Sequence, residues 1–238
     1  MKNLILIIFL LFLQQDYQEL KELFPKIKYD ENGNFLTRSL NAKTYVDLKQ
    51  EFKRIPDALS FKYLCDSDTS KFIYKYRVFN MDEDQWSDTI RQKFDHYSIL
   101  RFKKENYDFL IYSKYNTDDQ RLFMRSFDSE GHKTDELLIN EVAHSETGID
   151  LSRVRFSLIK PDSIKIFNYY DAENPNREDK KTPLVTKVVI EDYAIDSIGR
   201  FNQVAVDSML LSKPMNAYLG FIHMPEGDDP ARKYYTLW

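Results

Sequence analysis

The sequence is poor in cysteine and glycine, with 1 cysteine and 6 glycines among 238 residues. A lone Cys65 excludes an intramolecular disulfide, so the hydrophobic core must stabilise the fold. So few glycines leave little room for the glycine-rich loops that cradle phosphates, and no G-x-x-x-x-G-K-[ST] or G-x-G-x-x-G pattern occurs. We therefore expect no cofactor.

Basic residues are not in excess either. The chain has 34 Lys and Arg against 38 Asp and Glu, a formal net charge of -4. Nucleic-acid-binding proteins depend on a basic surplus, so we expect no nucleic-acid partner. The apolar run from Leu4 to Leu13 is shorter than the roughly 20 residues that cross a bilayer, so we also expect no membrane span.

That run has the layout of a secretory leader. Lys2 precedes it and Gln14 and Gln15 make the chain abruptly polar, which predicts a signal peptide-like leader over residues 1–15. A buried N-terminal helix or strand is the alternative. Because the residues from Phe12 to Gln15 are not the small ones that signal peptidases prefer, the cleavage point, and cleavage itself, stay open. We expect an exported protein, periplasmic or extracellular.

Residues 16–58 show helical spacing and form a predicted N-terminal helical segment. One apolar stripe ends at Pro25 and consists of Tyr17, Leu20, Leu23 and Phe24. A second ends at Pro56 and consists of Tyr45, Leu48, Phe52 and Ile55. We expect the stripe that ends at Pro56 to pack on a sheet and the stripe that ends at Pro25 to pack in the core.

The remaining residues, 59–238, predict an antiparallel β domain because short segments rich in Tyr, Phe, Ile and Val alternate with polar turns. The predicted strands are 60–65, 71–79, 97–104, 107–114, 120–127, 132–140, 153–159, 163–170, 184–195 and 200–211. Trp86, Ile90 and Phe94 recur every four residues and predict one helical excursion.

Three of the six glycines end the same four-residue pattern. Asp at the first position of a tight turn accepts hydrogen bonds from the turn backbone, and Gly at the fourth can adopt a positive φ. We therefore assign a structural turn role to Asp30 and Gly33, Asp128 and Gly131, and Asp196 and Gly199.

A longer unit is repeated around two of these turns. Each unit reads strand, tight turn, strand, loop, strand, Asp-x-x-Gly turn, strand, first over 99–140 and then over 156–206. Four-stranded units of this size are typical of propeller blades, although two unrelated runs of hairpins would look similar. The predicted fold class is mainly β: antiparallel four-stranded meander units, propeller-like or in an open curled sheet, with a small N-terminal helical segment.

The apolar leader and two stretches, Phe127 to Gly131 and Asp192 to Phe201, resemble uncharacterised exported β-rich proteins of Bacteroidota-type bacteria. The resemblance covers residues 55–206 and rests on turns. It implies an exported β-rich protein and gives no residue a catalytic role.

Catalytic and metal-binding signatures are missing. The four histidines, His96, His132, His144 and His223, form no H-E-x-x-H or H-x-H arrangement, so no metal site is predicted. The carboxylates cluster at Asp66/Asp68, Asp82/Glu83/Asp84, Asp118/Asp119 and Asp228/Asp229. We interpret these clusters as solvated turns, because a glycosidase needs two carboxyl groups facing each other across a cleft. No catalytic residue is predicted.

Aromatic residues are abundant, with 16 Tyr and 17 Phe. On strands they mostly fill cores, but some could line a binding platform. The candidate binding residues are Tyr74, Tyr76, Tyr112, Tyr115, Tyr169 and Tyr170. We expect a non-enzymatic protein that binds or neutralises a protein partner in the cell envelope. The alternative is a carbohydrate-active hydrolase or glycan-binding protein acting outside the cytoplasm.

Overall fold

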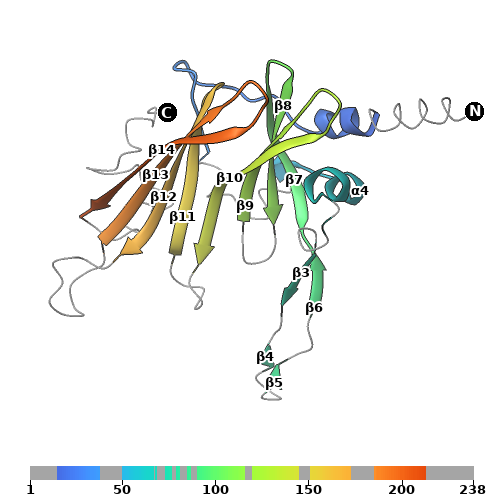
Figure 1. The fold of residues 1–238 in the computed structure, drawn as a ribbon. Coiled ribbons are helices and arrows are strands. Elements are labelled where there is room, and N and C mark those ends of the chain that lie inside the picture. The colour runs from blue at the N-terminus through green and yellow to red at the C-terminus, as the bar shows by residue number, and fades with distance from the viewer. Residues whose placement is uncertain are drawn as a thin grey trace, which may run out of the picture.

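The computed structural model describes residues 15–37, 50–66, 68, 73–76, 79–80, 85–86, 90–115, 120–144, 151–172 and 185–212. These residues form a mainly β protein built on one antiparallel sheet (Figure 1). Its long strands are β7 (Asp95–Lys104), β8 (Tyr107–Tyr115), β9 (Gln120–Phe127), β10 (Lys133–His144), β11 (Leu151–Ile159), β12 (Ser163–Ala172), β13 (Val185–Ile195) and β14 (Phe201–Leu211). Each pairs with the next along the chain, so the predicted meander is confirmed.

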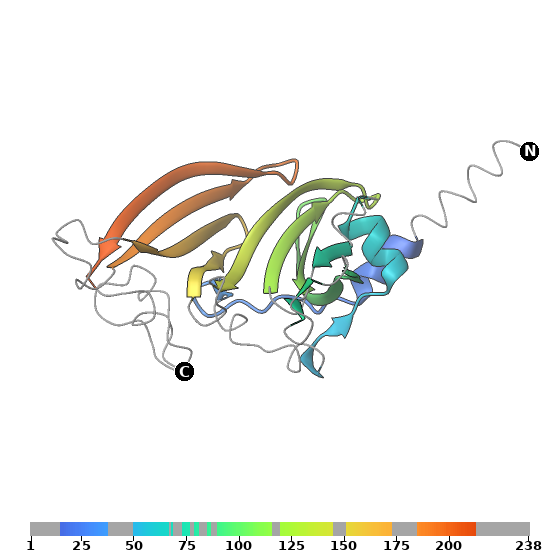
Figure 2. The ribbon, with the colours of Figure 1, turned by 90° about the horizontal axis from the view of Figure 1, so that it is seen from below.

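The two repeated four-stranded units correspond to β7–β10 and β11–β14. They are not separate propeller blades in the described part of the chain, because β10 and β11 pair directly and join them into one open sheet. This pairing runs only from Glu141, opposite Arg155, to His144, opposite Leu151. The strands of the sheet are strongly arched (Figure 2).

Where β11 no longer pairs with β10, a segment near the N-terminus pairs with β11 instead. Strand β1 (Phe35–Leu36) pairs with Leu158 and Ile159, and the following Thr37 is fully buried. The Thr37 hydroxyl contacts the Asn140 side chain of β10, and its backbone N–H donates to the Ser157 carbonyl of β11 at 2.8 Å. One threonine thus bridges the two four-stranded units.

The three Asp-x-x-Gly turns share one geometry. In each, the Gly N–H donates to the carbonyl of its Asp, at 3.0 Å for Gly33 and 3.2 Å for Gly131 and Gly199. The Asp carboxylate also accepts from the backbone N–H groups two and four residues later. The three glycines have φ between 72° and 88°, the left-handed region that favours glycine.

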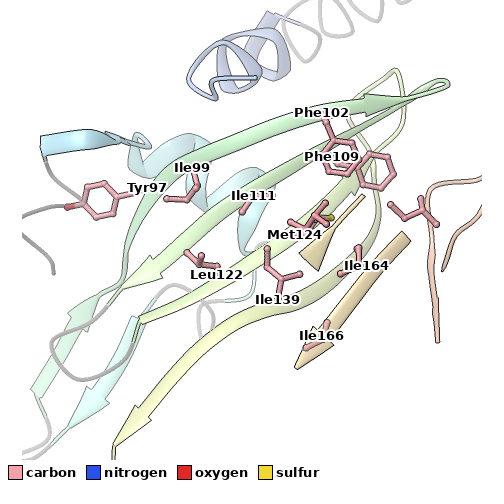
Figure 3. Close-up of a cluster of buried hydrophobic side chains, with 12 residues drawn as sticks. Tyr97, Ile99, Phe102, Phe109, Ile111, Leu122, Met124, Ile139, Ile164 and Ile166 are labelled. Atoms are coloured by element: carbon pink, nitrogen blue, oxygen red, sulfur yellow. The ribbon is translucent and has the colours of Figure 1, made fainter. Parts of the chain in front are cut away.

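The sheet is packed on both faces. One cluster, drawn in Figure 3, includes the stacked rings of Phe102 and Phe109, 4.7 Å apart, together with Ile111, Met124 and Ile164. A second cluster lies under the N-terminal helical segment, where residues 15–22 are helical and Tyr17, Leu20 and Phe24 are buried as predicted. A third cluster, on β11–β14, contains Phe156, Phe167 and Tyr169.

The last hairpin reaches back to the first strands of the sheet. The Lys104 ammonium group, on β7, donates to the Ile195 carbonyl at 2.6 Å. The Phe201 N–H, on β14, donates to the Asp135 carboxylate of β10 at 2.9 Å. These two bonds fix the β13–β14 turn against the rest of the sheet.

Predicted strand 60–65 is wrong. Helix α4 (Asp57–Leu59) continues into a π-helical turn, η1 (Ser60–Leu64), and together they bury Leu59, Tyr63 and Leu64 against the sheet. A short apolar run fits a buried strand and a buried helix equally well, and here the start after Pro56 favours the helix.

The predicted helix at Trp86, Ile90 and Phe94 is also wrong. Strand β6 (Ile90–Lys93) pairs with β3 (Ile73–Tyr76), and β5 (Gln85–Trp86) pairs with β4 (Phe79–Asn80). A spacing of four residues keeps side chains on one face of a strand as well as of a helix, so the pattern did not separate the two.

The predicted helix ending at Pro56 is contradicted at its end. Lys53 and Arg54 form β2, which pairs with Ser98 and Tyr97 of β7. Tyr45 and Leu48 lie outside the described residues, as do residues 1–14 of the predicted leader. In the part of the chain that the structure describes, no helix has the length and apolar character needed to cross a membrane.

Candidate functional site

The six candidate tyrosines do not come together as one platform. Tyr112 and Tyr169 are 2% and 0% exposed and pack in different clusters on the sheet. Tyr115 and Tyr170 are half-buried, near the ends of β8 and β12. Tyr74 and Tyr76 lie in β3, and their side chains are outside the described part. The binding role of the tyrosines stays a prediction.

The single cysteine is buried at the end of the π-helical turn. Burial raises the pKa of the Cys65 thiol to about 11, so the thiolate that a nucleophile requires is disfavoured at neutral pH. The location and the pKa agree with a small hydrophobic core residue.

A charge cluster around one buried arginine lies between that helical turn and the sheet. Arg125, on β9, is fully buried, and its guanidinium group donates to Glu136 of β10, with the Nε to Oε2 distance at 2.7 Å. It also donates to the Asp66 carboxylate at 2.8 Å and to the Tyr63 carbonyl. The Tyr112 hydroxyl donates to the same Glu136 oxygen at 2.7 Å.

The cluster connects the helical turn to the sheet. Two of the Arg125 acceptors, Tyr63 and Asp66, belong to the turn and the residues after it, while Glu136 belongs to the sheet. Lys133 adds a second positive charge on Asp66 at 2.7 Å. Burial raises the pKa of Tyr112, which keeps its hydroxyl protonated as the donor to Glu136. These polar groups bind one another, so we assign the cluster a structural role.

His96 lies beside this cluster, and its burial predicts that the folded protein loses stability in acid. Its ring is 5.9 Å from that of Tyr112 and its side chain is buried. Burial, together with the nearby charge of Lys114, lowers the pKa of His96 from 6.5 to about 4. Between these values the unfolded chain binds a proton that the folded protein excludes, so stability falls as the pH drops below 6.5.

We expect His96 to contribute about 2 kcal/mol to the loss of stability between pH 7.5 and pH 5.0. Urea unfolding of the wild type and of His96→Gln at both pH values measures it, because glutamine stays neutral. His132→Gln is the control, since the His132 side chain is 72% exposed. An acid loss that is the same in wild type and His96→Gln would contradict the prediction.

A second group of charges crosses one face of the sheet. Glu141, on β10, is 3% exposed and pairs with Arg121 of β9 at 2.9 Å and with Arg153 of β11. Arg155 pairs with Glu191 at 3.1 Å. Arg121 and Arg153 are each 41% exposed. The pairs stabilise neighbouring strands and leave two arginine side chains partly accessible.

The large apolar side chains that the structure describes as exposed lie on one strand and the turn before it. Among the described residues, the large hydrophobic side chains that are exposed are Val204 (64%), Val206 (58%), Leu210 (53%) and Ile198 (46%). Three lie on β14 and the fourth lies in the turn that precedes it. β14 is the last strand of the sheet, and among the described strands it pairs with β13 only. The edge strand β14 is therefore the candidate interaction surface.

Sequence reasoning predicted this strand but did not single out its side chains. The low charge of Phe201–Leu211, where Asp207 is the one charged residue, was a usable signal. A strand with these residues is ordinary in the middle of a sheet and unusual at an edge. Only the strand order shows that it is an edge.

Within the described ranges, no group of three or more His, Cys, Asp or Glu side chains is arranged to hold a metal ion.

No family model, curated protein or solved structure compared with this chain matches it.

Proposed function

We propose that this chain is an exported, non-enzymatic interaction module that binds a protein partner through the edge strand β14. The observation that carries the proposal is the concentration of the exposed large apolar side chains on β14 and its turn. Apolar side chains exposed along an edge strand are typical of a strand that can bind another chain. Export is supported by the sequence alone, through Lys2 and the apolar run from Leu4 to Leu13.

The edge of β14 suits recognition of an extended strand. An edge strand presents unpaired backbone N–H and C=O groups in a regular row, and a partner strand can pair with them. Side chains then add specificity, because alternate residues of β14 lie on the same face of the sheet. Val206 and Leu210 share one face and are both exposed.

The buried residues support binding rather than catalysis. Arg125 and Cys65 are buried, and the Arg125 guanidinium group is bonded to Glu136 and Asp66. A catalytic site needs comparable groups that can reach a substrate. The glycan platform receives less support, because Tyr112 and Tyr169 are buried.

An affinity capture tests the proposal. The protein is used as bait on extracts and secreted fractions of its source, beside two variants that each add a lysine to an exposed site. Val206→Lys changes the edge, and Glu130→Lys changes the exposed β9–β10 turn. We expect a protein partner that is retained by the wild type and by Glu130→Lys and lost by Val206→Lys. Equal retention by both variants would contradict the edge as the binding surface.

A further inference from the structure

The edge strand β14 is unprotected over most of its length. The seven residues 202–208 are all exposed, and Asp207 is the one charged residue between Phe201 and Leu211, in a chain that is 30% charged. Natural edge strands are commonly protected by lysine, proline or a bulge. β14 contains neither lysine nor proline, so the position of its bulge decides which part can accept another strand.

The bulge leaves one regular stretch. The pairing of β13 with β14 is irregular where Asp192 pairs with Ala205 and Tyr193 pairs with Gln203, which leaves Val204 as the extra residue. From Ala205 to Leu211 the pairing is regular. An added strand can therefore form a continuous ladder with these seven residues, and Ser208 is their midpoint.

A second copy of the same stretch fits this edge in one register. When two identical strands pair antiparallel about Ser208, each Val206 lies opposite the Leu210 of the other copy, and each Asp207 lies opposite a methionine, Met209. The two most exposed apolar side chains of the stretch then meet twice on one face. Like charges do not meet.

Neighbouring registers are worse. Pairing about Met209 places Val206 opposite Ser212 and Leu210 opposite Ser208, so the two exposed apolar side chains no longer meet. Pairing about Asp207 places two carboxylates directly opposite each other, which is destabilising. Pairing about Val206 leaves Leu210 opposite Asn202, which lies beyond the bulge. Charge and apolar contact therefore select the register centred on Ser208.

We propose that two copies of this chain dimerise through antiparallel pairing of their β14 strands, centred on Ser208, so that the two sheets become continuous. The proposal rests on the proposed function, since it names a second copy as the partner at that edge. The resulting contact is two-fold symmetric, with the same patch used by both copies.

Cross-linking tests the register directly. In the proposed dimer the two Ser208 residues lie opposite each other, and opposite residues of an antiparallel pair fall within the Cα separation that a disulfide spans, about 4.4–6.8 Å. Ser208→Cys in the full chain should form a covalent dimer under mild oxidation, while the exposed Asn202→Cys should not. The native Cys65 is buried and serves both variants as a common background.

A charge pair tests the same register without covalent chemistry. Val206→Lys and Leu210→Glu should each raise the dimer dissociation constant about tenfold or more, because each removes two apolar contacts. The double variant places the new lysine of each copy opposite the new glutamate of the other copy, so it should recover a large part of the affinity. Sedimentation velocity over a range of concentrations measures the three variants beside the wild type.

The outcomes separate this proposal from the function on which it rests. A monomer at every concentration, with no cross-link through Ser208→Cys, would overturn the dimer. If the same protein still captures a different partner that Val206→Lys loses, the proposed function stands without the dimer. A dimer that Val206→Lys leaves intact would place the contact elsewhere and overturn the proposal.

Discussion

Replacing Arg125 by methionine should lower the free energy of unfolding by about 3–5 kcal/mol, which is the usual cost of removing one partner from a buried ion pair. Arg125 is fully buried and is the main positive partner of Glu136, whose side chain is 19% exposed. Without the guanidinium group, Glu136 keeps a carboxylate that water reaches only in part. The Tyr63 carbonyl also loses its donor. Urea unfolding at neutral pH measures the effect.

A double variant shows whether the unpaired carboxylate is the cause. Glu136→Gln removes the charge and keeps an oxygen that accepts from the Tyr112 hydroxyl. We therefore expect Arg125→Met with Glu136→Gln to be more stable than Arg125→Met alone, by about 1 kcal/mol or more. Lys133→Met is the comparison for a pair at the surface, since Lys133 and Asp66 are 31% and 33% exposed. Its cost should stay below about 1 kcal/mol. Similar costs for Arg125→Met and Lys133→Met would contradict a special role for the buried cluster.

Replacing Gly131 by alanine should destabilise the protein by about 2–5 kcal/mol, the sum of a strained backbone and an overpacked contact. Gly131 has a φ of 88°, and an added Cβ would lie 2.6 Å from Cγ of Tyr17. The Tyr17 ring is fully buried beside Tyr63 and Phe127, so it has little room to move away. Thermal and urea unfolding measure the loss.

The Asp-x-x-Gly turn that ends at Gly33 provides a matched control. Gly33 has a φ of 72°, and an added Cβ there would meet nothing within 4 Å. Gly33→Ala should therefore cost only the backbone strain, about 1–2 kcal/mol. In a Tyr17→Leu background the cost of Gly131→Ala should fall toward the Gly33→Ala value. Equal costs for Gly33→Ala and Gly131→Ala in the wild type would show that Tyr17 does not resist the added methyl group.

Much of the sheet was predictable because its strands carry local signals. Predicted strands 107–114 and 163–170 lie within observed strands β8 and β12, since alternating apolar residues bounded by polar turns favour the strand conformation. The Asp-x-x-Gly turns are local as well, because their hydrogen bonds join residues at most four positions apart. Local signals need no knowledge of the rest of the chain.

The errors occurred where the local pattern fits two structures. The segments at 60–65 and 86–94 are short and rich in aromatic residues, and each was assigned the wrong element. Packing decided both cases: Tyr63 and Leu64 are buried on the face of the sheet opposite the cluster that contains Phe102 and Phe109, and Ile90–Lys93 pairs with β3. Propensity does not include these partners.

The candidate site was harder to predict from the sequence than the fold. Arg125 and Asp66 are 59 residues apart, and nothing in the sequence indicates that they meet. Tyr112 was predicted to contact a ligand, yet it donates a hydrogen bond to Glu136 inside the protein. The binding surface proposed instead, on β14, depends on the order of the strands.

The sequence by itself determined the mainly β class, the positions of the eight long strands and the geometry of the three turns, because alternation and turn chemistry act between near neighbours in the chain. Only the tertiary structure decided that the two four-stranded units join through β10 and β11, that Arg125 is buried in an ion-pair cluster and that β14 is an edge. These features depend on contacts between residues far apart in sequence, whose energies appear only when the whole sheet has formed.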